Sequence, residues 1–404
     1  MSANAQIKFN SWLHWFTVLT AVATFLLIGL GGLVTSHEAG MSVPDWPTSY
    51  GYNMFALPIK FWTGGAFFEH THRLLASEVG VLTVVMCCWL FGNKSRLVVR
   101  WFGVALVAAG IHAWIRSHSP SWQAGAYFGV HGLALFAASF VWPKCEPSPK
   151  WLRLLGIVAF FGVVAQGVLG GLRVTMHMDS LGIFHGAVAQ AFLVLICAMA
   201  LFTSRAWLER ASSKIISVPR GLRSHVLFVT LLIFVQLLIG ATMRHQHAGL
   251  AISDFPLAHG KIWPATDPEA ISRYNAERME TSNVNPITAF QVVLQMVHRG
   301  AALLIVAGVV AAAVLAAKRL GKKDFLTRLA CFWLGLLLAQ IGLGAWTLWS
   351  NKAADIATLH VMVGALSLVT GALWCLIAFG RLQPLPETES SAVFGANPAL
   401  AGSK

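Results

Sequence analysis

Ten continuous apolar runs dominate the sequence. Each is close to the ~20 residues that an α-helix needs to cross the hydrocarbon core of a bilayer. Apolar and polar residues do not alternate within the runs, and lipid admits only segments whose backbone hydrogen bonds are satisfied internally, so we expect helices rather than strands. The predicted spans are residues 12–34, 70–91, 98–115, 122–142, 152–173, 181–203, 224–243, 289–317, 326–348 and 357–379.

The composition excludes a soluble globular enzyme. Of the 404 residues, 56% are hydrophobic and 11% are charged, whereas a soluble domain usually carries about 25% charged residues. The formal net charge of +13 comes from basic residues in short loops between the runs. This pattern sets orientation in a membrane and does not indicate a nucleic-acid partner. We therefore expect a multi-pass protein of the cell (inner, cytoplasmic) membrane, surrounded by lipid, with both termini cytoplasmic.

Two long loops, at about 35–69 and 244–288, lie on the opposite side and repeat each other. Residues 39–47 align without gaps with residues 248–256, and an aspartate, an aromatic residue and a proline end both segments. The span after each loop carries a His-Arg pair, and later spans carry a Gln-x3-Gly element and then one early histidine. These elements are Glu69-x-x-His72-Arg73 with Gln295-x-x-His298-Arg299, Gln166-x3-Gly170 with Gln340-x3-Gly344, and His185 with His360.

The repeat predicts an all-α polytopic membrane protein built from two pseudo-symmetric four-helix bundles. The N-terminal half is expected at 1–205, the C-terminal half at 220–380, and a disordered cytoplasmic tail at 381–404. His72 and His185 are 113 residues apart but His298 and His360 only 62, and the surplus of 51 matches one inserted helical hairpin at about 97–147. This hairpin brings the predicted number of transmembrane helices to about ten.

Four of the histidines lie at matched depth, about 9–15 Å from the outer surface by helix rise. Two facing histidines inside a helix bundle are typical axial ligands of a haem iron, so His72, His185, His298 and His360 are predicted to bind haem. The alternative for each is a histidine that only packs and hydrogen-bonds within the membrane. His131, in the inserted hairpin, is the main rival of His185 as a ligand.

Glu69 is the main difference between the two halves. It lies one helical turn from His72 on the same face, whereas the equivalent Gln295 cannot ionise. An ionisable group at the edge of the hydrocarbon is a candidate acid–base catalyst, although Glu69 can instead simply pair with Arg73 at i+4. Arg73 and Arg299 are candidates to bind haem propionates through bidentate hydrogen bonds, or to serve as interfacial anchors.

Taken together, these motifs resemble the haem A synthase family over about 12–92 and 151–380. The resemblance implies oxidation of the C8 methyl group of haem O to the formyl group of haem A through a hydroxymethyl intermediate, for terminal oxidase assembly. It implies that His298 and His360 hold a resident haem b, that His72 and His185 face the substrate haem, and that Glu69 is the catalytic carboxylate. The chain departs from many members by lacking a cysteine pair in the first outer loop and by carrying the extra hairpin.

Haem O as substrate, handed over by haem O synthase, and haem A as product follow from the same resemblance. Two other functions remain open on the sequence: a bis-histidine di-haem electron-transfer protein and a haem carrier. The sequence identifies neither the electron partner nor whether the chain forms a homo-oligomer.

Overall fold

A computed structural model describes residues 9–116, 122–142, 145–209, 217–277 and 286–380, and these are almost entirely helical. A helix coincides with every predicted span, so the all-α prediction is confirmed. The helices are α1 (Ser11–Ser36), α2 (Gly64–Leu90), α3 (Arg96–Arg116), α4 (Trp122–Phe140), α5 (Lys150–Thr175), α6 (Ser180–Thr203), α8 (Arg220–His245), α10 (Ala289–Leu320), α11 (Phe325–Trp349) and α12 (Ala354–Gly380). The predicted tail at 381–404 lies outside the described residues.

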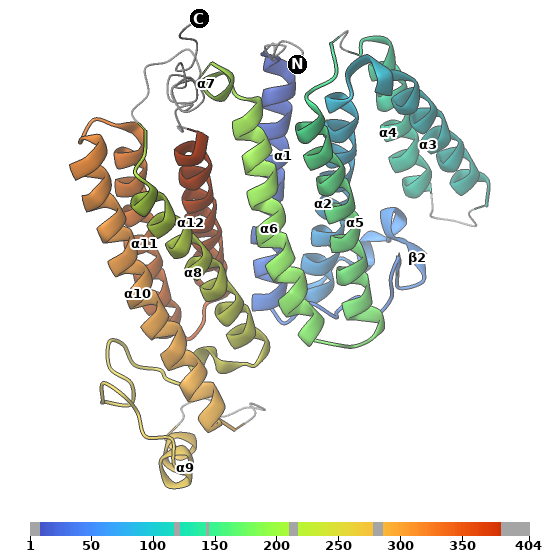
Figure 1. Cartoon of the computed structure of the whole chain (residues 1–404). Helices are drawn as coiled ribbons and strands as arrows, with labels where there is room; N and C mark the ends of the chain where they lie inside the picture. The colour runs from blue at the N-terminus through green and yellow to red at the C-terminus, as the bar shows by residue number, and fades with distance from the viewer. Residues whose placement is uncertain (1–8, 117–121, 143–144, 210–216, 278–285, 381–404) are drawn as a thin grey trace, which may run out of the picture.

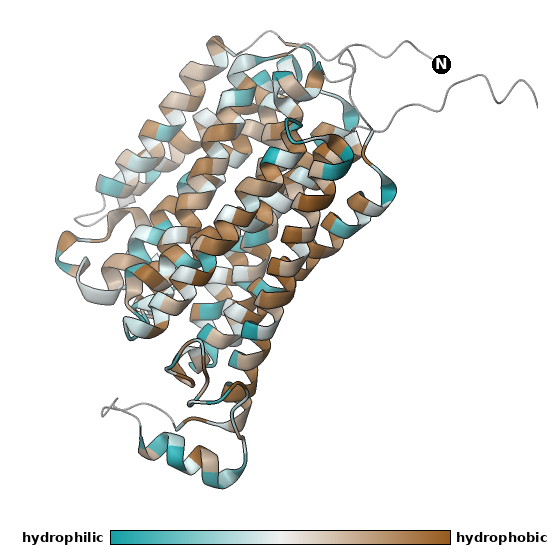
Figure 2. Cartoon of the chain, turned by 90° about the vertical axis from the view of Figure 1, so that its left-hand side faces the viewer, coloured by the Kyte–Doolittle hydropathy of each residue, from teal (hydrophilic) through white to brown (hydrophobic). Residues whose placement is uncertain are grey.

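Within the described chain, nine of these helices are long and apolar enough to cross a membrane, one fewer than predicted. The exception is α4, which is helical over 19 residues but carries Gln123, Tyr127 and His131 among its apolar residues. Figure 2 shows apolar residues along the lengths of the helices and polar residues mainly at their ends and in the loops. The chain is therefore a multi-pass membrane protein.

Eight of the ten helices form two groups of four, and α3 and α4 lie outside these groups (Figure 1). In the first group α1 packs on α2, α2 on α5, α5 on α6, and α6 closes the ring on α1. In the second group α8 packs on α10, α10 on α11, α11 on α12, and α12 packs back on α8. The two bundles meet where α1 packs on α12 and where α6 packs on α8 and α12. We call this contact the seam.

The core of the second bundle contains two fully buried tryptophans, Trp333 and Trp374. Each indole N–H has an acceptor, the Ser367 Oγ at 2.9 Å and the Leu326 carbonyl at 2.9 Å, so neither polar atom is left unsatisfied in an apolar interior. Outward-facing side chains of the second bundle, such as Leu303 on α10, are apolar and exposed. This distribution is expected of helices that face lipid.

The inserted hairpin is α3 and α4, which lie beside α2 at the edge of the first bundle (Figure 1). Glycines bring the two backbones into direct contact. A Cβ atom on Gly110 would lie 2.8 Å from the Gly125 carbonyl oxygen, and one on Gly132 would lie 2.6 Å from the Val107 nitrogen. Small residues allow such close approach where lipid provides no hydrophobic drive for helix association.

The two long loops lie at the same end of the molecule, which we call the loop end (Figure 1). The first loop forms a two-stranded hairpin and two 3-10 turns, and the second a 3-10 turn and a short helix that the sequence analysis did not predict. These elements are β1 (Thr48–Ser49), β2 (Tyr52–Asn53), η1 (Met54–Ala56), η2 (Ile59–Phe61), η5 (Ala248–Leu250) and α9 (Pro268–Ala276). Asp267 caps α9 by accepting a hydrogen bond from the Ala270 nitrogen at 3.0 Å. At the opposite end lie η3 (Gly92–Ser95) and α7 (Arg205–Leu208).

Candidate functional site

His72 on α2 and His185 on α6 meet inside the first bundle. Their ring centroids are 6.5 Å apart and the ring planes are inclined at 76°. Two imidazoles that share one metal ion should have centroids about 6 Å apart, since each nitrogen lies ~2 Å from the metal and each ring centre ~1 Å further. The spacing of His72 and His185 therefore fits a metal held between the two rings.

His298 on α10 and His360 on α12 take the equivalent places in the second bundle, against Gly240 of α8 and Gly344 of α11. The four histidines share one further property. The Nδ1 atom of each ring is buried and has no hydrogen-bond partner among the described residues. Buried polar atoms are usually satisfied, so the same unpartnered nitrogen at four equivalent positions shows that the two histidine pairs share one local environment.

Each of the four rings lies against a glycine of the neighbouring helix. A Cβ atom on Gly31, Gly170, Gly240 or Gly344 would lie 3.2–3.4 Å from the Cε1 atom of His72, His185, His298 or His360, respectively. A larger side chain would push against the ring, so the glycines allow each imidazole to pack directly on the backbone of the neighbouring helix. The sequence identifies Gly170 and Gly344 only as parts of the repeated Gln-x3-Gly element, and the contacts of all four glycines with the histidine rings come from the structure.

Three of the four glycines follow a glutamine by four residues. Gln166 donates to the His185 carbonyl at 3.1 Å, and Gln236 donates to the His298 carbonyl at 2.8 Å. Gln340 lies 3.4 Å from the His360 Nε2 atom. The fourth helix, α1, has Leu27 four residues before Gly31. The helix that faces His72 is therefore the one without an amide, and the two halves differ at this point.

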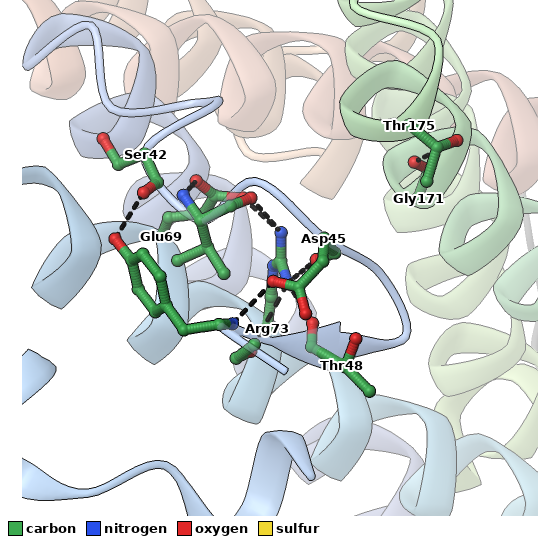
Figure 3. Close-up of polar contacts among 10 residues, drawn as sticks. Ser42, Asp45, Thr48, Glu69, Arg73, Gly171 and Thr175 are labelled. Carbon is green, nitrogen blue, oxygen red and sulfur yellow. Dashed lines mark hydrogen bonds and ion pairs between the residues drawn. The ribbon is translucent and has the colours of Figure 1, made fainter. Parts of the chain in front are cut away.

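Glu69 lies one turn before His72, buried under the first loop (Figure 3). Its Oε2 atom accepts from the Val43 backbone nitrogen at 2.9 Å, and its Oε1 atom pairs with Arg73 at 2.6 Å. Arg73 in turn donates to the carbonyl of Asp45 at 2.7 Å and to that of Val43 at 3.1 Å. The i+4 pair considered from the sequence is thus present, and it fastens the first loop to α2.

The second loop is fastened to α10 in the same manner. Gln295 accepts from the Ile252 nitrogen at 2.8 Å and donates to the Ile252 carbonyl at 3.0 Å. Arg299 donates to the carbonyls of Asp254 at 2.7 Å and Leu257 at 2.8 Å. Both arginines predicted to bind propionates are therefore engaged with loop carbonyls, and their role toward a haem stays a prediction.

An aspartate organises the turn within each loop. Asp45 accepts from the nitrogens of Tyr50 and Gly51, at 2.6 and 2.8 Å, and Asp254 accepts from those of His259 and Gly260, at 2.7 and 2.9 Å. Burial raises the pKa of each carboxyl, but these hydrogen bonds outweigh it, and both pKa values lie below the usual 3.8. The two aspartates, which are equivalent in the sequence repeat, therefore accept equivalent pairs of backbone hydrogen bonds in the two loops.

His131, the rival of His185, is not brought to His72. Its Nε2 atom lies 3.1 Å from the Oε2 atom of Glu78 on α2, and its Nδ1 atom lies 2.8 Å from the Tyr127 carbonyl. Glu78 is two helical turns beyond His72 on the side away from the loops. His131 therefore serves the contact between the inserted hairpin and α2.

Comparison with known proteins places this arrangement in a family. Residues 123–372, which include His185, His298 and His360, match the COX15-CtaA family, described as cytochrome oxidase assembly protein. A protein of Rhizorhabdus wittichii named "Heme A synthase" is 24% identical over 379 residues, covering 90% of this chain and 93% of the relative. A relative of the same name from Geobacillus kaustophilus is 23% identical over 387 residues, covering 94% of this chain and 96% of the relative. Another, from Symbiobacterium thermophilum, is 29% identical over 242 residues, covering 56% of this chain and 70% of the relative. The chain belongs to the COX15-CtaA family of cytochrome oxidase assembly proteins, as its motifs predicted.

Proposed function

We propose that this chain is a haem A synthase, an oxidoreductase that converts haem O to haem A by oxidising the C8 methyl group to a formyl group through a hydroxymethyl stage. The relatives that match along most of the chain carry this name. The observation that carries the proposal is the pairing of His72 with His185, at 6.5 Å, in the bundle where a carboxylate, that of Glu69, stands three residues before a site histidine, in the place that Gln295 takes in the other bundle.

The described residues fit haem in both bundles. Each bundle offers two buried imidazoles whose Nδ1 atoms have no partner among the described residues, and each ring packs on a glycine of the neighbouring helix. In this proposal His298 and His360 hold a resident haem b, and His72 and His185 hold the substrate haem. Haem iron held by imidazole supplies, when bound, the electron and oxygen chemistry that oxidation of a methyl group requires.

The contrast between Glu69 and Gln295 supports the N-terminal half, residues 1–205, as the reactive one. Both residues fasten their loop through a backbone nitrogen, at 2.9 and 2.8 Å. An amide is thus sufficient to hold the loop in the half 220–380, whereas the carboxylate of Glu69 adds an ion pair with Arg73 and the capacity to ionise. We propose that Glu69 holds or moves a proton during the reaction.

The remaining parts of the proposal concern the cellular setting. The chain would lie in the cytoplasmic membrane with the loop end on the outer side, because the basic loops mark the opposite side as cytoplasmic. It would receive haem O from haem O synthase, and its electron partner is a separate molecule.

The test is haem extraction from membranes of a host that makes haem O but no haem A, with and without this chain, followed by chromatography with mass detection. Haem A or its hydroxymethyl precursor is expected only when the chain is present. Haem B and haem O alone, in a protein shown to be folded and haem-loaded, would overturn the proposal and favour the electron-transfer or carrier function.

A further inference from the structure

A cavity of about 220 Å³ opens at the loop end of the seam. We call it the seam pocket. Both bundles line it: Arg173 ends α5 and Asp179 follows in the turn to α6, whereas Arg244 ends α8 and Lys352 lies in the turn between α11 and α12. Glu38 of the first loop completes its charged lining. The pocket thus gathers three permanent cations and two carboxylates from segments far apart in the sequence.

Arg244 carries a charge without a counterion. Its Nη2 atom crosses the seam to donate to the Gly32 carbonyl at 2.9 Å and to the Ser36 Oγ at 2.7 Å, both neutral acceptors on α1. In the described part of the chain, Arg244 forms no ion pair. A cation in a partly buried site without a carboxylate partner favours binding of an anion.

Arg173 retains an unused donor. Its Nη2 atom pairs at 3.0 Å with Asp179, whose side chain is half exposed, but its Nε atom is buried and has no partner among the described residues. The guanidinium packs on the backbone of Gly40, where a Cβ atom would overlap it. The guanidinium is therefore fixed in place at the pocket wall, and Asp179 is its one ion-pair partner among the described residues.

Each arginine lies one helical turn beyond a glycine that faces a histidine. Arg173 follows Gly170 by three residues and Arg244 follows Gly240 by four, both toward the loop end. The pocket therefore lies about one helical turn from the glycines that contact His185 and His298.

The two arginines do not repeat each other. The position equivalent to Arg173 in the second half is Thr347 on α11, and the position equivalent to Arg244 in the first half is Thr35 on α1. Each half therefore has one arginine at this level, on the helix that borders the shared cavity. This arrangement makes one common site instead of one per bundle.

We propose that the seam pocket binds carboxylate groups of both tetrapyrroles, with Arg244 serving the resident haem and Arg173 the substrate haem. The inference rests on the proposed function. Guanidinium groups suit carboxylates because they form paired, charge-assisted hydrogen bonds. The C8 methyl group of the porphyrin lies beside a propionate, so holding that propionate at Arg173 also determines where the reacting methyl group stands.

The experiment uses Arg173→Gln and Arg244→Gln in the full-length protein. Each has a matched control on the same helix at the opposite end: Arg153→Gln on α5 and Arg223→Gln on α8, where each guanidinium lies over a phenylalanine. The first readout is an optical redox titration of the resident haem. In the wild-type protein the Arg244 cation disfavours the ferric state, so Arg244→Gln is expected to lower the reduction potential of the resident haem. Arg244→Lys keeps the positive charge and is expected to reverse most of this shift. An unchanged potential in Arg244→Gln with a normal haem spectrum would overturn the assignment of Arg244.

The second readout identifies the anion. Apoprotein is reconstituted with protohaem or with its dimethyl ester, which has no free carboxylates. Wild type is expected to retain protohaem about tenfold or more longer, the scale of one charge-assisted hydrogen bond, and Arg244→Gln to lose this preference. Equal retention of both haems by wild type, with phospholipid lost on purification of Arg244→Gln, would show a lipid phosphate in the pocket and overturn the proposal.

The third readout concerns Arg173. Binding of haem O, titrated by its absorption change, is expected to weaken in Arg173→Gln and not in Arg153→Gln, while the resident haem is unaffected. Haem O binding that is equal in the two variants would overturn the role of Arg173. A wild-type protein that binds no bis-histidine haem at all would instead refute the proposed function, and its missing haem spectrum distinguishes that outcome.

Discussion

Glu69 and Gln295 hold the two outer loops through the same hydrogen bond. The Oε2 atom of Glu69 accepts from the Val43 nitrogen at 2.9 Å, and the Oε1 atom of Gln295 accepts from the Ile252 nitrogen at 2.8 Å. The molecule therefore contains its own control for the carboxylate: one loop is fastened with an ionisable group and the other without one. The most informative substitution in this chain is Glu69→Gln, which gives both halves an amide at this position.

Glu69→Gln is expected to reduce the rate of haem A formation by roughly 10²–10⁴-fold, the usual contribution of an acid–base group. Both haems are expected to remain bound. The amide can accept from Val43 as Gln295 accepts from Ile252, and Arg73 keeps its hydrogen bonds to the Asp45 and Val43 carbonyls, so the first loop is expected to stay in place without the ion pair. Haem extraction and the absorption spectrum of the purified protein measure the two effects. Glu78→Gln, a second glutamate of α2 that pairs with His131, is the control and should keep activity. Normal haem A formation by Glu69→Gln would remove Glu69 from the mechanism.

His298→Ala and His360→Ala are each expected to eliminate the low-spin spectrum of the resident haem, because each removes one axial ligand. His131→Gln should leave that spectrum and haem O binding intact, since His131 pairs with Glu78 and not with His72. His185→Ala should weaken haem O binding alone. Absorption and electron paramagnetic resonance spectra of the purified variants distinguish these cases, and loss of substrate binding in His131→Gln would reinstate it as a ligand.

Gly344→Leu is expected to weaken binding of the resident haem. A Cβ atom at this position would lie 3.2 Å from the Cε1 atom of His360, and the larger side chain would force the ring out of position. Overpacking of this kind costs about 1–3 kcal/mol, or roughly 5–150-fold in affinity. Gly335→Leu on the same helix has no atom within 4 Å of its Cβ and serves as the control. Equal haem retention in the two variants would show that the glycine has no part in the site.

Acidification is expected to loosen both outer loops. Hydrogen bonds from backbone N–H groups hold the pKa of Asp45 and Asp254 below the usual 3.8, so the carboxylates stabilise the folded loops fully above that value. This contribution is lost as the pH falls through the lowered pKa values. Hydrogen exchange of the Gly260 amide, followed from pH 7 to pH 3, should show faster opening at the acid end. Asp254→Asn should flatten this pH dependence, and an unaltered profile in that variant would assign the effect to other groups.

The helical spans, the duplicated loops and the four histidines were predictable from the sequence. Continuous apolar runs have one stable backbone conformation in lipid, so span positions follow from composition alone. The number of spans was less certain because α4 mixes Gln123, Tyr127 and His131 with its apolar residues. The short helix α9 was missed because its nine residues are too few and too polar to form an apolar run.

Other features of the candidate site were decided by helix packing. Gly31 faces His72 and Gly240 faces His298 because their helices are neighbours. Gly240 carries the same Gln-x3-Gly pattern as Gly170 and Gly344, whereas no such pattern marks Gly31 among the 36 glycines of the chain. His131 was separated from His185 by the docking of the inserted hairpin on Glu78.

The sequence by itself determined the membrane class of this protein, its internal repeat and the residue types available for haem. The tertiary structure decided which of those residues meet. Arg173 and Arg244 are 71 positions apart in the sequence and look like ordinary helix-end cations, yet both line the seam pocket. The physical reason is that burial and local hydrogen bonding fix each helix separately, whereas a site between bundles exists only after the helices have packed.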